Sequence, residues 1–233
     1  MFQMSRDALP TALRRTRRQC RILLLLEAAE RAGIAPIESQ RFHAFAYLAD
    51  VLAPVWQLLP FDGLVLKSEG GPHFPDIQRD LDSLVIAGLV EIEDIQYVER
   101  PNGSRIEARY GLNFASSHLP ALLAALGASG AESSFDQNDA ETHAYFVRLA
   151  QALATLPNDE IDRAAAVDAT YSDRRIDTLN LVLFDQADSS SKRSNLTLEV
   201  TERFKDFLPS DAHISPGERL YLYASYLGNR ANV

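Results

Sequence analysis

The chain of 233 residues has one cysteine, Cys20, and lacks any apolar run approaching the ~18 residues that a membrane span requires. A single cysteine excludes an internal disulfide framework and a metal site with several thiolate ligands. The longest apolar run, Ile22–Leu26, is followed at once by charged residues and is shorter than the hydrophobic part of a signal peptide. We therefore expect a cytoplasmic protein with no membrane partner.

Sequence signatures of catalysis are also missing. The five histidines have no paired spacing, and the chain contains neither a G-x-S-x-G elbow nor a P-loop nor a G-x-G-x-x-G fingerprint. Cys20 adjoins Arg18 and Arg21, whose charge could lower its pKa, but no companion acid or base can be assigned to it. We expect no catalytic residue, no metal and no cofactor, and hence a protein that is not an enzyme.

The net charge of −9 is unevenly distributed. Residues 1–21 carry +5, so the remaining 212 residues carry −14. An acidic body repels phosphate backbones, which leaves the basic segment as the only expected route to DNA. Its candidate contact residues, for DNA or for an acidic partner, are Arg14, Arg15, Arg17, Arg18 and Arg21. Four of them share one face if the segment is helical; the alternative is a solvated extension.

Hydrophobic periodicity predicts a definite order of elements up to residue 113. Helices are expected over 22–32 and 38–58, and a short strand over 64–67. A further helix over 75–87 ends at Gly88 and is followed by two strands joined through Asn102–Gly103, a strong hairpin signal. Helix, helix, short strand, helix and hairpin is the order of a winged helix-turn-helix.

The rest of the chain is predicted to be mainly helical. We expect a basic arm (1–21), a winged-helix domain (22–115), a linker (116–138) and a helical C-terminal domain (139–233), which gives a mainly α (α+β) fold. The apolar run 178–184 is either a strand or a buried helix. Near the C-terminus, Tyr221, Tyr223 and Tyr226 cannot all face one core, so they indicate a protein interface or plain core packing.

The charge of the predicted winged helix is unfavourable for reading DNA. Its third helix has Asp76, Asp80 and Asp82 against Arg79 alone. The hairpin region is also acidic, with five carboxylates (Glu91, Glu93, Asp94, Glu99 and Glu107) against three arginines (Arg100, Arg105 and Arg109). Because phosphate contacts need exposed Lys and Arg, this pattern favours docking onto protein.

Three segments resemble a known family. They are Phe42–Ala49 (FHAFAYLA), Gly71–Phe74 (GPHF) before the helix over 76–87, and the Gly88–Val90 exit, with a weaker echo in Leu220–Leu227. The pattern is similar to the middle components of bacterial three-component ABC-ATPase defence systems, of which the Lamassu group is the best known. The resemblance covers mostly residues 20–113. It implies a non-enzymatic subunit of an anti-phage or anti-plasmid complex that associates with an SMC/Rad50-like ATPase and an effector nuclease.

Two functions are therefore expected. The first is an adaptor subunit that bridges such an ATPase and its effector. The alternative is a winged-helix transcriptional regulator, dimeric through its C-terminal helices, that binds a palindromic operator.

Overall fold

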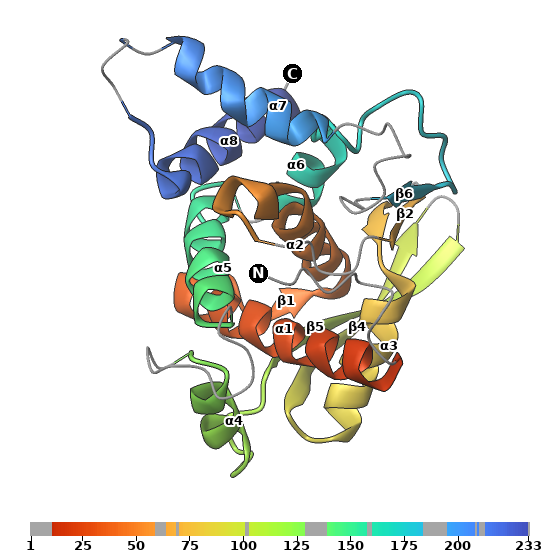
Figure 1. Ribbon diagram of the computed structural model, residues 1–233. Coiled ribbons are helices and arrows are strands. Elements are labelled where there is room, and N and C mark those ends of the chain that lie inside the picture. Colours follow the sequence, from red (N-terminus) through yellow and green to blue (C-terminus); the bar gives the residue numbers. More distant parts are fainter. Residues whose placement is uncertain are drawn as a thin grey trace.

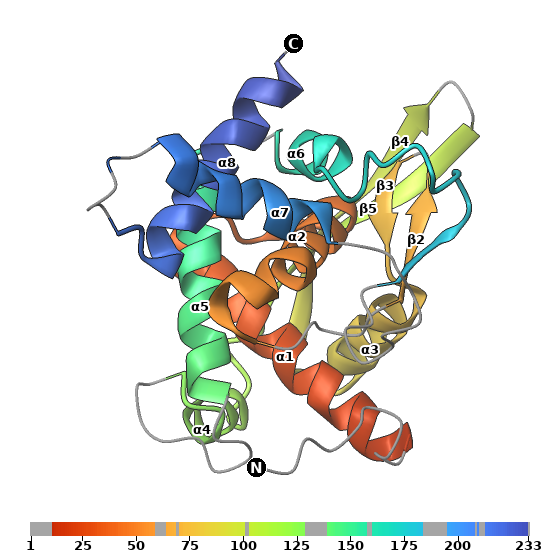
Figure 2. The same ribbon diagram turned by 45° about the horizontal axis from the view of Figure 1, so that its top comes forward.

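The computed structural model describes residues 11–58, 64–68, 70–100, 103–128, 139–157, 160–183, 195–207, 209 and 213–232. Eight α-helices and two small antiparallel sheets occupy these residues (Figures 1 and 2). The mainly helical class expected from the sequence is confirmed. Within the described residues, no helix has the length and apolar composition needed to cross a bilayer.

Three helices form the centre of the molecule: α1 (Thr11–Ala32), α2 (Ser39–Leu52) and α5 (Asp139–Leu153). Helix α1 is longer than predicted, because the arginine-rich residues from 11 onward continue the same helix. It ends at Gly33, whose positive φ of 71° suits a residue without a Cβ. Helix α2 stops earlier than predicted, because a short 3-10 turn with Pro54 in its first turn, η2 (Ala53–Trp56), follows it.

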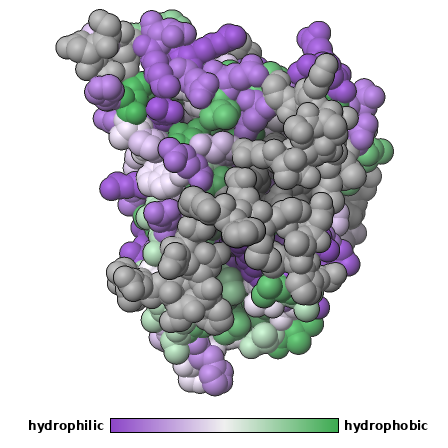
Figure 3. Space-filling view, in the orientation of Figure 1, coloured by the Kyte–Doolittle hydropathy of each residue, from purple (hydrophilic) through white to green (hydrophobic). Residues whose placement is uncertain are grey.

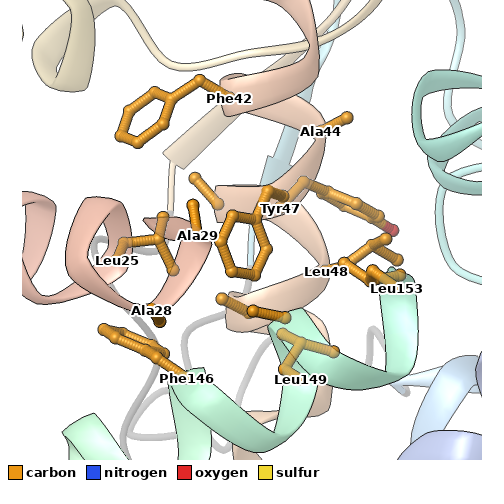
Figure 4. Close-up of a cluster of buried hydrophobic side chains, with 14 of the residues drawn as sticks. Leu25, Ala28, Ala29, Phe42, Ala44, Tyr47, Leu48, Phe146, Leu149 and Leu153 are labelled. Atoms are coloured by element: carbon orange, nitrogen blue, oxygen red, sulfur yellow. The ribbon is translucent and has the colours of Figure 1, made fainter. Parts of the chain in front are cut away.

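The core lies where these three helices meet. Figure 4 shows Leu25 and Ala29 of α1, Leu48 of α2 and Leu149 of α5 in one cluster of buried side chains, whereas Tyr47 of α2 extends away from α1. All five are at most 1% exposed. Burial of these side chains supplies the main driving force for folding, since each buried aliphatic or aromatic side chain contributes about 1.5–3 kcal/mol to stability.

The first sheet is a long hairpin with a short third strand. Strands β4 (Val90–Arg100) and β5 (Gly103–Leu112) pair antiparallel, as predicted, and β1 (Ile37–Glu38) pairs with the other edge of β5. The order is therefore β1-β5-β4, which leaves β4 at an edge. Helix α3 (Pro75–Ile86) precedes the hairpin and packs on α1 and β4.

The second sheet joins distant parts of the chain. Strand β2 (Leu64–Ser68) pairs with β3 (Gly71–His73), a strand that the sequence did not predict. Its other edge pairs with β6 (Leu181–Leu183), so the ambiguous run 178–184 supplies a strand. This pairing connects the expected N-terminal and C-terminal domains.

The remaining helices are α4 (Leu119–Ala125), α6 (Ile161–Val167), α7 (Leu196–Arg203) with the 3-10 turn η3 (Phe204–Phe207), and α8 (Pro216–Ala231). Helix α4 lies in the expected linker, of which residues 129–138 are outside the described part. Helix α8 packs on α5 and α6; α5 packs in turn on α1 and α2, and α6 packs on α2. Buried residues from Ile22 to Leu227 form one continuous hydrophobic cluster.

Candidate interaction surface

The arginines predicted to contact DNA or a partner lie in the first half of α1. Arg14 and Arg15 are exposed, Arg17 and Arg18 are half-buried, and Arg21 is buried. They do not form one solvent-facing group, because this part of α1 packs against α3. Residues 1–10 of the expected arm lie outside the described residues.

Two of these arginines bind a carboxylate of α3. Asp80, whose side chain is 2% exposed, accepts from Arg15 Nε at 3.0 Å and from Arg18 Nε at 2.5 Å. Arg15 also donates to Ser83 Oγ at 2.7 Å, and Arg18 Nη1 lies 3.7 Å from Asp76. Two arginines of the basic segment therefore pair with two carboxylates of α3 across the α1–α3 contact.

The solvent-facing side of α3 has few basic groups. Arg79 is exposed and pairs with Asp76 on its own helix, and Asp82 is exposed nearby. The last turn ends at Ile86, a side chain that is 87% exposed. In Figure 3, hydrophobic residues gather toward the lower edge of the face shown, whereas the upper part, over α7 and α8, is largely hydrophilic.

The tyrosines of α8 do not share one environment. Tyr223 is fully buried, and its hydroxyl donates to Asp168 at 2.5 Å; burial, together with that carboxylate, raises its pKa far above the ordinary value. Tyr226 is half-buried and packs on Phe204 and Tyr223, with Arg230 over its ring. Tyr221 is half-buried as well. Of the two roles expected for these tyrosines, a protein interface or core packing, Tyr223 has the second.

The pKa of Cys20 is not lowered by the neighbouring arginines. Burial raises the pKa of its thiol, and the charge of Asp139 raises it further. A thiol with a raised pKa is a poor nucleophile at neutral pH. The flanking arginines suggested by the sequence do not reverse this effect.

Within the described residues, no group of three or more His, Cys, Asp or Glu side chains is placed to hold a metal ion. A small cavity between α1, α2 and α5 is lined by Arg21, Asp50, Thr142 and Tyr145. It is far smaller than the several hundred Å³ typical of a ligand pocket.

Two buried polar clusters were not found from the sequence. Asp168, at 0% exposure, accepts hydrogen bonds from Tyr47, Thr197 and Tyr223. Glu27 accepts from His143 and Arg31. Arg31 is at the i,i+4 spacing from Glu27, but His143 and the partners of Asp168 are distant in the chain, so no spacing rule could have added them.

Searches against protein-family models, curated proteins and solved structures found no match to this chain.

Proposed function

We propose that this chain is a non-enzymatic adaptor subunit that works by binding other proteins, and that its N-terminal half is a winged helix. The order of α1, β1, α2, α3 and the β4–β5 hairpin supports the winged helix, as does the sheet order β1-β5-β4. The β2–β3 hairpin between α2 and α3 is a departure, because a helix-turn-helix joins these helices by a short turn.

The observation that carries a protein-binding role is the pairing of Arg15 and Arg18 with buried Asp80. A DNA-reading winged helix needs lysines and arginines free to neutralise phosphates, and each lost contact weakens binding and its salt dependence. Here two of the five arginines are held by the third helix itself. What α3 presents to solvent is a mixed surface with Asp82 and Ile86.

The partners in this proposal are an SMC/Rad50-like ATPase and an effector nuclease of an anti-phage or anti-plasmid system. They come from the resemblance of Phe42–Ala49 and Gly71–Phe74 to the middle components of ABC-ATPase defence systems. Most of those residues are buried in α2 and around β3. They therefore support a shared fold more directly than a shared partner.

The test is co-expression with the product of a neighbouring coiled-coil ATPase gene, followed by affinity purification and light scattering. We expect a complex of defined stoichiometry that survives gel filtration at moderate salt. A chain that elutes alone when the ATPase is folded and present contradicts the proposal.

A winged-helix transcriptional regulator is the second candidate, and the exposure of Arg14 and Arg79 favours it. It predicts tight, salt-dependent binding to one operator sequence. Arg14→Ala/Arg79→Ala should abolish such binding, and Arg163→Ala/Arg174→Ala is a matched removal of two arginines elsewhere. Failure to select any preferred DNA sequence from a random pool would exclude this candidate.

A further inference from the structure

The outer half of the β4–β5 hairpin has an uncovered apolar face. Val90, at the start of β4, is buried, but Ile92, Ile95 and Tyr97 are 39%, 66% and 70% exposed. In the register of the hairpin, Ile92 lies opposite Tyr110 and Ile95 lies opposite Ala108. Since directly opposed residues share a face, Ile92, Ile95 and Tyr97 form one band that continues the core face beyond α3.

A β-bulge makes this band continuous. The register shifts between Ile92 and Asp94, so Glu93 is an extra residue in β4. Without it, the side chains of Ile92 and Ile95, three residues apart, would point to opposite faces of the sheet. The bulge therefore places all three apolar side chains of β4 on the same side.

The opposite face of the same strand is acidic. Glu91 lies across from Gly111, and a Cβ at Gly111 would be 3.0 Å from Glu93 Oε1 and 3.4 Å from Glu30 Oε1. Burial raises the pKa of Glu30, and the charges of Glu93 and Glu91 raise it further. These carboxylates are thus close enough to repel one another, and a cation placed beside them would relieve that repulsion.

Strand β4 also has an open edge. The sheet order is β1-β5-β4, and no strand among the described residues pairs with the outer side of β4. In both views the free end of the hairpin reaches the periphery of the molecule, away from the helices (Figures 1 and 2). An edge strand of eleven residues with unpaired backbone groups is a template for strand addition.

We propose that β4 binds an extended segment of a partner protein as an added strand, and that apolar residues alternate with lysine or arginine in that segment. Alternate side chains of an added strand fall on the two faces of the sheet. Its apolar residues therefore contact Ile95 and Tyr97, and its basic residues meet Glu91 and Glu93, since Asp94 lies opposite Arg109 of β5. A second copy of this chain does not fit, because its own β4 would bring the same carboxylates against them. The inference rests on the proposed protein-binding role and names the kind of segment that is bound.

The test uses three labelled ten-residue peptides and the full chain. In the first peptide valine alternates with lysine; in the second glutamate replaces lysine; the third has the composition of the first in scrambled order. Fluorescence anisotropy should give a Kd for the first peptide about tenfold or more below that of the other two. Hydrogen exchange should slow at backbone amides of β4 on binding. Equal affinity for the scrambled peptide, or no protection of β4, overturns the proposal.

Variants on the exposed strand provide the controls, and none removes a core side chain. Ile95→Thr/Tyr97→Thr should weaken the first peptide about tenfold or more, whereas Phe207→Ser, at another exposed apolar residue, should not weaken it. Glu91→Lys/Glu93→Lys should abolish the preference for lysine over glutamate. Glu202→Lys/Asp206→Lys makes the same charge change on α7 and η3 and should retain that preference.

The outcomes separate this inference from the proposed function. An ATPase complex that still forms with Ile95→Thr/Tyr97→Thr, while the peptides fail to bind β4, overturns the inference and leaves the adaptor role. Peptide binding at β4 without any ATPase complex supports the inference and contradicts the adaptor role. A dimer that dissociates on Ile95→Thr/Tyr97→Thr assigns the edge to a second copy and overturns the inference.

Discussion

The carboxylate of Asp168 is buried and depends on several hydrogen bonds from other parts of the fold. It is fully buried, and one or other of its oxygens accepts from the hydroxyls of Tyr47, Thr197 and Tyr223 and from the backbone N–H groups of Thr170 and Tyr171. A buried charge is tolerated only when hydrogen bonds replace its lost hydration. Because its donors come from α2, the loop after α6, α7 and α8, Asp168 fixes how these elements meet.

Replacement of this carboxylate should strongly destabilise the protein. Asp168→Ala leaves several buried donors unpaired, and each unsatisfied group costs about 1–3 kcal/mol, so the free energy of unfolding should fall by about 3 kcal/mol or more. Tyr223→Phe removes one charge-assisted bond and should cost about 1.5–3 kcal/mol. Tyr221→Phe, on the half-buried side of α8, should stay within about 0.5 kcal/mol of wild type. Urea denaturation measures all three, and equal effects of the two tyrosine variants would refute the role of Asp168.

Glu27 gives the stability a predictable pH dependence. Burial by itself would raise the pKa of Glu27, but hydrogen bonds from His143 and Arg31 and the charges of these two residues bring it below the ordinary value. A carboxyl with a lowered pKa in the folded state stabilises the protein above the unfolded pKa, near 4.3, and that stability is lost as the pH falls through the folded pKa.

Glu27→Gln should therefore reduce stability at pH 7 and flatten its decline between about pH 5 and 3. Chemical denaturation at a series of pH values measures this. The control Glu202→Gln, at an exposed position of α7, should keep the wild-type decline. A Glu27→Gln curve parallel to wild type would contradict the assignment.

At the scale of elements, the contact between α1 and α3 decides what the arginine-rich segment does. Asp80 is 2% exposed, whereas the side chains of Arg15 and Arg18 are 55% and 13% exposed. An exposed ion pair contributes about 0–1 kcal/mol, but removal of one partner from a buried pair costs about 3–5 kcal/mol. The three residues are therefore expected to differ in importance.

Asp80→Ala should lower the free energy of unfolding by about 2–4 kcal/mol, and Arg18→Ala should cost more than Arg15→Ala. Asp82→Ala removes an exposed carboxylate of the same helix and should change stability by less than about 0.5 kcal/mol. Thermal denaturation followed by circular dichroism ranks the four variants. If Asp80→Ala and Asp82→Ala were equally mild, the α1–α3 pairing would not hold the two helices together.

At the scale of the whole molecule, the N-terminal and C-terminal halves share one hydrophobic cluster and one sheet. Strand β2 pairs with β6, and the only tryptophan, Trp56, packs against Tyr145 of α5 with ring centroids 5.8 Å apart. Helix α8 covers α5 and α6. Halves that share this much buried surface are expected to unfold together.

A single cooperative transition should follow from this arrangement. Trp56 fluorescence reports the contact between η2 and α5, and far-UV circular dichroism reports all helices, so their midpoints in guanidinium should coincide. Residues 139–233 expressed alone should not fold, because α5 and α6 would expose the faces that pack on α1 and α2. Two separated transitions, or a folded C-terminal half, would instead support independent domains.

Much of the fold could be predicted from local signals. Gly33 and Gly88 ended their helices, and Asn102–Gly103 indicated the hairpin, because these residue types act through the backbone within a few positions. The strand in 178–184 could not be assigned, since its partner β2 lies more than a hundred residues earlier. The one-residue bulge at Glu93 also has no clear local signal, yet it decides which face Ile95 and Tyr97 occupy.

The sequence by itself determined the helical periodicities, the hairpin and the separation of basic from acidic residues, because each depends on neighbours along the chain. Tertiary structure decided what those charges do. Arg15 and Arg18 of α1 bind Asp80 of α3, more than sixty residues away. Two of the arginines expected to contact DNA or a partner therefore make a contact within the protein. The whole fold likewise buried Asp168 and Glu27, whose carboxylates accept hydrogen bonds from several elements, and placed Tyr223 in the core.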